Sequence, residues 1–160
     1  MASIIFGLDL GTRCGWAVLD EDGTRRASGT WDLRPHRHAG AGMRYVMLEA
    51  HLNKLRETYG PDGLLLAYEE CVALRGDPSR VYNSMLGVVQ AACERWNIPY
   101  RGIPVATVKR TATGKGNANK EMMIEAARKR WWPVSEPVGI DDNEADALLT
   151  AESLRIELYP

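Results

Sequence analysis

The sequence predicts an α/β fold in which helices flank one mixed sheet of five strands. Short apolar runs that end at turn residues indicate the strands, and apolar residues three or four positions apart indicate the helices. The first three runs are joined by short turns and the later two follow helices, an order typical of a sheet with antiparallel and parallel pairing. With 160 residues, 45% of them hydrophobic, the chain can bury one core, so we expect a single domain over residues 1–160.

Three strands open the chain. Residues 3–10 are rich in large apolar side chains and end at a glycine, which indicates a buried strand followed by a turn. Residues 15–20 and 25–33 flank Asp22 and Gly23, a pair that supplies the positive backbone dihedral angles of a tight hairpin.

The remaining elements alternate helices with strands. Apolar stripes at helical spacing indicate the helices, and an apolar run that turns acidic at its end indicates the fourth strand. In chain order we expect a loop over 34–42, a helix ending at Gly60, a strand over 64–70, a helix over 81–96, a strand over 98–108 bent at Pro104, a loop over 110–119, and helices over 120–132 and 142–158.

The composition says more about the expected cellular compartment than about the binding partner. The formal net charge of -1 argues neither for nor against nucleic acid, because the positions of lysines and arginines matter more than their sum. Cys14, Cys71 and Cys93 lie far apart and lack the close pairs of zinc sites or disulfide frameworks. No apolar run approaches the roughly 20 residues that span a bilayer, and the start has no basic leader. We therefore expect a soluble protein of the reducing cytoplasm.

Four carboxylates occupy positions where apolar core residues are expected. Asp9 and Glu69 end strands, and Asp142 and Asp146 lie on the last helix, where residues four apart share one face. A buried carboxylate loses hydration and needs a counter-charge, and hard divalent cations such as Mg²⁺ prefer oxygen ligands. Two ions about 4 Å apart can activate a water and clamp a scissile phosphate. The pattern therefore favours a metal-dependent nuclease.

Each carboxylate also has an ordinary structural explanation. Asp9 can accept hydrogen bonds from the turn that follows it, and Glu69 or Glu70 can be a solvated strand end. The acidic pair at 141–142 suits the N-cap of the last helix, and Asp146 can lie on that helix's surface. Convergence of these side chains at one place is what separates a metal site from these alternatives.

Over nearly its whole length the sequence resembles the RuvC family of Holliday junction resolvases, especially the compact phage-type members. Residues 7–11 followed by Gly15 look like the family's first-strand motif, and residues 67–69 look like its second acidic strand. Residues 108–120 are similar to the family pattern V-K-x-x-x-x-G-x-G-x-A-x-K without a gap, which is the most specific match. Residues 145–148 resemble the family's final acidic helix.

The resemblance implies an RNase H-like fold, a homodimer, Mg²⁺ or Mn²⁺ with two ions per active site, and paired nicks that resolve four-way DNA junctions in a bacterial or phage-infected cell. It also implies that Asp9, Glu69 and Asp146 are catalytic metal ligands. The family usually has Asp or His three residues before the last aspartate, whereas this chain has Asn143 there. We expect Asp142 to complete the site, with the residue on either side of it as the alternatives.

A basic flank marks the expected DNA-binding surface. Residues 101–132 carry eight lysines and arginines against two glutamates. Lysines and the backbone amides at helix starts bind phosphates without reading sequence. We expect Lys109, Lys115 and Lys120 to contact DNA; a mobile glycine loop beside a solvated helix face is the alternative.

Two further residues are candidates for contact with DNA. Arg80 and Tyr82 follow the second acidic strand and could reach the junction centre, where a tyrosine can stack on an unpaired base. His36 and His38 lie in a loop rich in proline and glycine without further ligands, so we assign them no metal-binding role.

Three other functions are compatible with the sequence. Residues 7–12 also resemble the first phosphate loop of the actin and Hsp70 superfamily, although such ATPases and sugar kinases need two lobes and this chain can supply one. A non-catalytic DNA-binding module would keep the fold and lose the chemistry. A nuclease for RNA or for other DNA branches would share the fold and metal site, because these alone do not decide the substrate.

Overall fold

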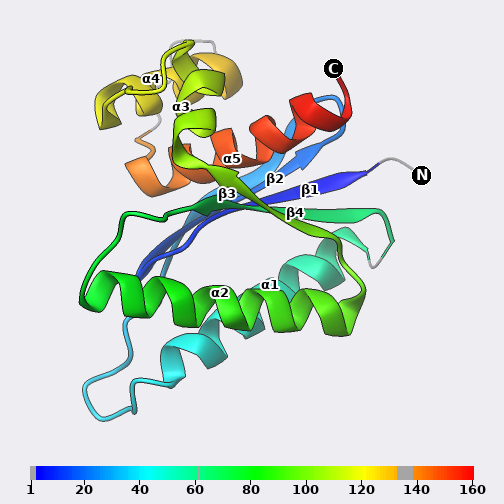
Figure 1. The fold of residues 1–160 in the computed structure, drawn as a ribbon. Helices are drawn as coiled ribbons and strands as arrows, with labels where there is room; N and C mark the ends of the chain where they lie inside the picture. The colour runs from blue at the N-terminus through cyan, green and yellow to red at the C-terminus, as the bar shows by residue number, and fades with distance from the viewer. Residues whose placement is uncertain (1–2, 61, 133–138) are drawn as a thin grey trace.

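The computed structural model describes residues 3–60, 62–132 and 139–160, and it confirms the predicted mixed α/β architecture (Figure 1). One five-stranded sheet has the order β3-β2-β1-β4-β5. The first three strands pair antiparallel, and β4 lies parallel to both β1 and β5. The strands are β1 (Ile4–Asp9), β2 (Arg13–Asp20), β3 (Arg25–Asp32), β4 (Leu64–Glu70) and β5 (Tyr100–Pro104). The helices are α1 (Met43–Tyr59), α2 (Asp77–Trp96), α3 (Val105–Thr113), α4 (Lys120–Trp131) and α5 (Asp142–Leu158).

Helices cover both faces of the sheet (Figure 1). On one face α1 and α2 pack against Phe6 and Leu8 of β1. On the other face α3, α4 and α5 enclose a second core around Ile5 and Leu148. None of the helices that the structure describes combines the length and the apolar character needed to span a bilayer.

The predicted hairpin between β2 and β3 is present. Gly23 has a φ of +87°, a conformation that favours glycine. The carboxylate of Asp22 accepts a hydrogen bond of 2.8 Å from the Thr24 amide, which closes the turn. The Asp-Gly pair therefore performs the role that the sequence predicts for it.

The predicted strand over residues 98–108 is wrong beyond Pro104. There the chain turns into α3, which also includes residues 110–113 of the expected loop. Val108 is fully buried, and the hydroxyl of Ser153 on α5 donates a hydrogen bond of 2.9 Å to Thr111. These contacts with the helical layer override the β preference of the valines and threonines in this segment. Gly114, with a φ of +75°, then ends the helix.

Helix α5 lies directly on the sheet because two strands carry glycine at the crossing points. A Cβ atom on Gly7 of β1 would lie 2.1 Å from the carbonyl oxygen of Ala147. A Cβ atom on Gly15 of β2 would lie 1.8 Å from the carbonyl oxygen of Asn143. Any larger residue at either position would push the helix away from the sheet.

We predict that Gly7→Ala lowers the free energy of unfolding by at least ~2 kcal/mol, because the added methyl group meets the α5 backbone. Gly87→Ala is the matched control: Gly87 is an exposed position within α2 with no atom near its Cβ direction. Removing glycine there should stabilise the protein by about 0.5–1 kcal/mol. Urea unfolding of both variants measures the difference, and equal effects would contradict the close approach of α5.

Candidate active site

Adjacent strands place two carboxylates side by side. β1 and β4 are parallel neighbours with Leu8 opposite Tyr68, so Asp9 and Glu69 follow at the same level of the sheet. Side chains alternate between faces along a strand. Gly7 contacts α5, so Asp9, two residues later, points toward the same face. The pattern directs Glu69 to that face as well, while Glu70 is exposed.

Helix α5 brings the other two predicted carboxylates to the same place. Its backbone crosses Gly15 at Asn143 and Gly7 at Ala147, which carries Asp142 and Asp146 over the ends of the central strands. Negative charge on Glu69, Asp146 and Asp142 acts on Asp9 in that order of strength. The structure therefore brings together four carboxylates from three elements, here called the acidic cluster: Asp9, Glu69, Asp142 and Asp146.

The neighbouring aspartate has a structural role. Asp141 is the N-cap of α5 and accepts hydrogen bonds from the Glu144 amide at 2.8 Å and the Thr30 hydroxyl at 2.7 Å. Arg13 lies 3.5 Å from its second oxygen. Since these contacts occupy both oxygens of Asp141, Asp142 is the more available of the two as a ligand within the cluster.

Burial and mutual repulsion perturb the acidic cluster. The pKa of Asp9 is raised well above its ordinary value, first by burial and then by the surrounding carboxylates. The same causes raise the pKa of Asp146 to about 7. Burial also raises the pKa of Glu69. Perturbed groups gathered in one place in this way are typical of a functional site.

Donor chemistry in the cluster fits a hard divalent cation, but no closed cage is formed. Within the described parts of the chain, no three His, Cys, Asp or Glu side chains stand close enough to hold one ion between them. The Nζ atom of Lys120 lies 2.7 Å from an oxygen of Asp142 and supplies positive charge there. Magnesium commonly binds through one or two carboxylates and keeps several waters, so an open arrangement is compatible with it.

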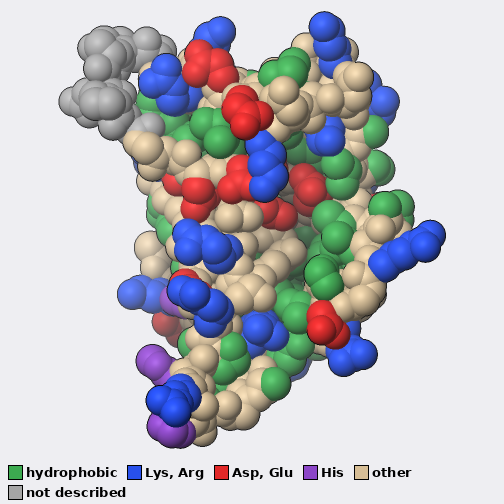
Figure 2. All heavy atoms as spheres, turned by 90° about the vertical axis from the view of Figure 1, so that its left-hand side faces the viewer, with side chains coloured by type: hydrophobic (Ala, Val, Ile, Leu, Met, Phe, Trp, Pro, Cys, Tyr) green, Lys and Arg blue, Asp and Glu red, His purple; other side chains and the backbone are tan. Residues whose placement is uncertain are grey.

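Positive groups lie beside the acidic cluster (Figure 2). The positive charge of Lys109 on α3 lowers the pKa values of both Glu69 and Asp146, and Lys120 acts on Asp146 in the same sense. Lys115 is exposed in the loop between α3 and α4. Two of the three predicted DNA-contact lysines thus adjoin the carboxylates, and the third lies on the loop between them in sequence.

The expectation that Tyr82 stacks on a DNA base is wrong for this conformation. Its side chain is in the core with 4% of its surface exposed. The hydroxyl donates a hydrogen bond of 2.9 Å to the Glu69 carbonyl and accepts one of 3.2 Å from the Cys71 amide. Tyr82 therefore holds the end of β4. Arg80, in contrast, is exposed on the first turn of α2, 3.7 Å from Asp77.

Sequence reasoning also missed Cys71. Its thiol donates a hydrogen bond of 3.5 Å to the Glu69 carboxylate, and burial together with that carboxylate raises the thiol's pKa to about 12. The thiol therefore stays protonated as a donor. No sequence pattern marks this residue, whereas the spacing of Tyr82, Met85 and Val89 could have identified the tyrosine as part of the buried stripe of α2.

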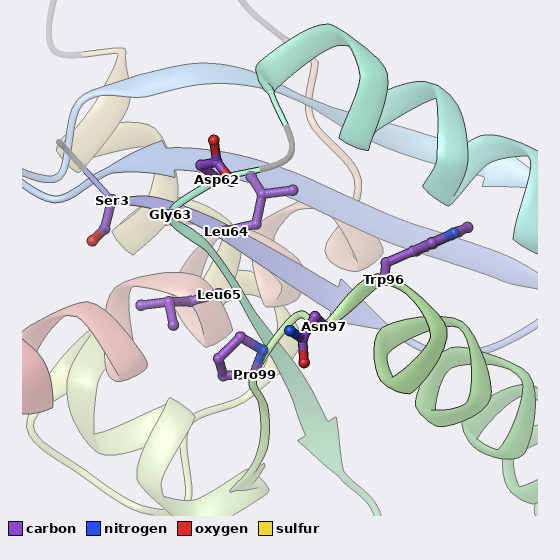
Figure 3. Close-up of a pocket in the computed structure, with 8 residues that line it drawn as sticks. All are labelled: Ser3, Asp62, Gly63, Leu64, Leu65, Trp96, Asn97 and Pro99. Atoms are coloured by element: carbon purple, nitrogen blue, oxygen red, sulfur yellow. The ribbon is translucent and has the colours of Figure 1, made fainter.

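A pocket at the opposite end of the sheet has no comparable chemistry (Figure 3). It lies where β4 begins, beyond the end of α2, and Asp62 is the one ionisable side chain among the residues that line it. The lining residues are Ser3, Asp62, Gly63, Leu64, Leu65, Trp96, Asn97 and Pro99. We assign this pocket no catalytic role.

The raised pKa of Asp146 predicts a pH-dependent stability in metal-free protein. The Asp146 carboxyl group has a pKa of 3.8 when the chain is unfolded and about 7 when it is folded. Its protonated form therefore contributes stability that is fully present below about pH 3.8 and is lost as the pH rises through about 7. Asp146→Asn should therefore raise the melting temperature more at pH 8 than at pH 5.5. At pH 8 the free energy of unfolding should increase by on the order of 2–4 kcal/mol. Thermal unfolding in EDTA measures this, with exposed Asp62→Asn as the control. An equal gain at both pH values would contradict the prediction.

Comparison with known proteins identifies the family to which the chain is similar. No family model matches the chain. The crossover junction endodeoxyribonuclease RuvC of Synechococcus sp. (strain CC9605) is 30% identical over 149 residues, which cover 92% of this chain and 94% of the relative. The protein of the same name from Corynebacterium diphtheriae is 30% identical over 157 residues, covering 93% of each.

Solved structures confirm the predicted RNase H-like fold. Thermus thermophilus RuvC, solved in complex with a Holliday junction substrate, superposes with a TM-score of 0.79 at 20% identity, covering 97% of this chain and 96% of that one. The yeast mitochondrial Holliday junction resolvase Ydc2 gives a TM-score of 0.62 at 16% identity, covering 98% and 81%. Sequence identity over almost the full length of both partners, joined with this shared fold, shows that the chain belongs to the RuvC family of crossover junction endodeoxyribonucleases.

Proposed function

We propose that this chain is a structure-selective endonuclease that resolves four-way DNA junctions by paired hydrolysis of phosphodiester bonds. The observation that carries the proposal is the acidic cluster, which unites side chains from β1, β4 and α5 at one edge of a RuvC-type fold. Residues 1–160 form one nuclease domain in this proposal. Two copies in a homodimer would present two clusters, one for each nick.

The acidic cluster is the proposed binding site for Mg²⁺ or Mn²⁺, with two ions per active site. Asp9, Glu69, Asp142 and Asp146 would supply oxygen ligands, and a bound cation would relieve the repulsion that raises the pKa values of Asp9 and Asp146. When bound, the ions supply activation of water and stabilisation of the leaving oxygen. Glu69 is positioned for this by the Cys71 thiol and, through its backbone, by Tyr82.

The proposed DNA contacts surround this site. Lys109 lies near Glu69 and Asp146, and it can neutralise a phosphate that approaches the carboxylates. Lys120 is paired with Asp142, and its ammonium group would be available to a DNA phosphate when Asp142 serves as a metal ligand. Lys115 and Arg80 are exposed and would bind phosphates farther from the scissile bond.

We predict that the purified protein with Mg²⁺ or Mn²⁺ cuts synthetic four-way junctions far faster than linear duplex, and that EDTA abolishes cutting. Asp146→Asn should still bind the junction but cut it roughly a thousandfold more slowly, because an ion ligand is lost while the DNA-binding surface remains. Gel assays of cleavage and binding measure both.

The matched control for this experiment is Asp62→Asn, the same change at the opposite end of the sheet (Figure 3), which should cut like wild type. Tight junction binding without cleavage in either metal would instead support a non-catalytic module. ATP turnover without junction cleavage would support the hypothesis of an ATPase related to actin and Hsp70.

A further inference from the structure

The geometry points to a second DNA-binding segment on the side of the acidic cluster opposite the lysines of α3 and α4. This segment covers residues 33–44, which link β3 to α1 and include the first two residues of that helix, and is here called the arginine loop. We infer that it binds the phosphodiester backbone of DNA. The inference rests on the proposed function for its DNA ligand, and it adds a contact surface that lies outside residues 101–132.

The arginine loop leaves the sheet at the same end of the strands as the acidic cluster. The amide of Leu33 donates a hydrogen bond of 2.8 Å to the carbonyl of Thr12, in the turn that follows Asp9. In the β2–β3 register Arg13 lies opposite Asp32, and Arg13 also reaches Asp141 at the start of α5. The loop is therefore anchored within a few residues of the cluster.

Charge in the arginine loop has one sign. Residues 33–44 include Arg34, Arg37 and Arg44 and no aspartate or glutamate. Arg34 is 69% exposed and is held by Asp32, which precedes the loop. Arg37 is exposed, and no ion pair within the described chain involves it. A guanidinium without a protein partner is suited to a phosphate.

The backbone of the loop is ordered and open. The Ala39 amide bonds the His36 carbonyl at 2.9 Å, and the Met43 amide bonds the Gly40 carbonyl at 3.0 Å. Gly40 and Gly42 have no atom within 4 Å of where a Cβ would lie, and neither has a positive φ. Neither packing nor backbone conformation explains glycine here. Close approach of a nucleic-acid backbone would explain it.

The space-filling view shows what the two basic segments enclose. In Figure 2 many Asp and Glu side chains gather across the upper middle of the face, with blue Lys or Arg side chains above them and further blue side chains, together with His, below. A polyanion that crosses this face must pass over negative charge, so cations on only one side would leave it weakly held. Cations on both sides hold the strand across the carboxylates.

The test uses the full chain with both loop arginines neutralised, Arg34→Gln with Arg37→Gln. Binding to a four-way junction is measured in Ca²⁺ between 50 and 200 mM salt. We expect about tenfold weaker binding at 100 mM salt and a slope of log K against log salt that is less steep by about 2, because two phosphate contacts are lost. The cleavage rate at saturating junction in Mg²⁺ should change less than about twofold.

The matched control is Arg26→Gln with Arg95→Gln, which removes the same charge outside both basic segments. Both arginines are exposed; Arg26 pairs with Asp20 as Arg34 pairs with Asp32, and Arg95 pairs with Glu49. Unchanged affinity and salt slope in the loop variant would overturn the inference, and so would an equal loss in the control. Failure of wild type to cut would count against the proposed function alone, since the salt slope is measured without cleavage.

Discussion

The close contact between α5 and the strands beneath it is the constraint on which the rest of the structure depends. Gly7 and Gly15 let the helix backbone approach the sheet closely, because the carbonyl oxygens of Ala147 and Asn143 occupy the space that a Cβ atom would need. Because the helix lies so low, Asp142 and Asp146 come within electrostatic reach of Asp9. A helix held one methyl group farther away would weaken that coupling and widen the space that a cation must fill.

The acidic cluster opposes the stability of the fold that creates it. Burial and like charge raise the pKa values of Asp9 and Asp146, so the ionised cluster costs folding free energy at neutral pH. Lys109 and Lys120 offset part of that cost without closing the site. Such local instability is common where the side chains of a site must bind an ion and a substrate rather than one another.

Contacts elsewhere keep the surrounding elements in place. Glu152 on α5 is buried and accepts two hydrogen bonds from Arg155, with Arg130 of α4 at 3.6 Å. The indole of Trp131 donates to the Gly23 carbonyl at 3.0 Å, which ties α4 to the hairpin between β2 and β3. From the other face of the sheet, Tyr82 of α2 secures the strand end that carries Glu69. Both helical layers thus contribute to one site.

The sequence by itself determined the five strands, the Asp-Gly hairpin and the positions of carboxylates at strand ends, because these depend on local periodicity and turn chemistry. Tertiary structure decided the rest. Residues 105–113 became a helix through packing against α5, and the Tyr82 hydroxyl has its partner at the end of β4, a contact that the periodicity of α2 does not predict. Two contacts of Asp141, with Thr30 and Arg13, come from residues more than 100 positions away, so only the folded chain distinguishes it from Asp142.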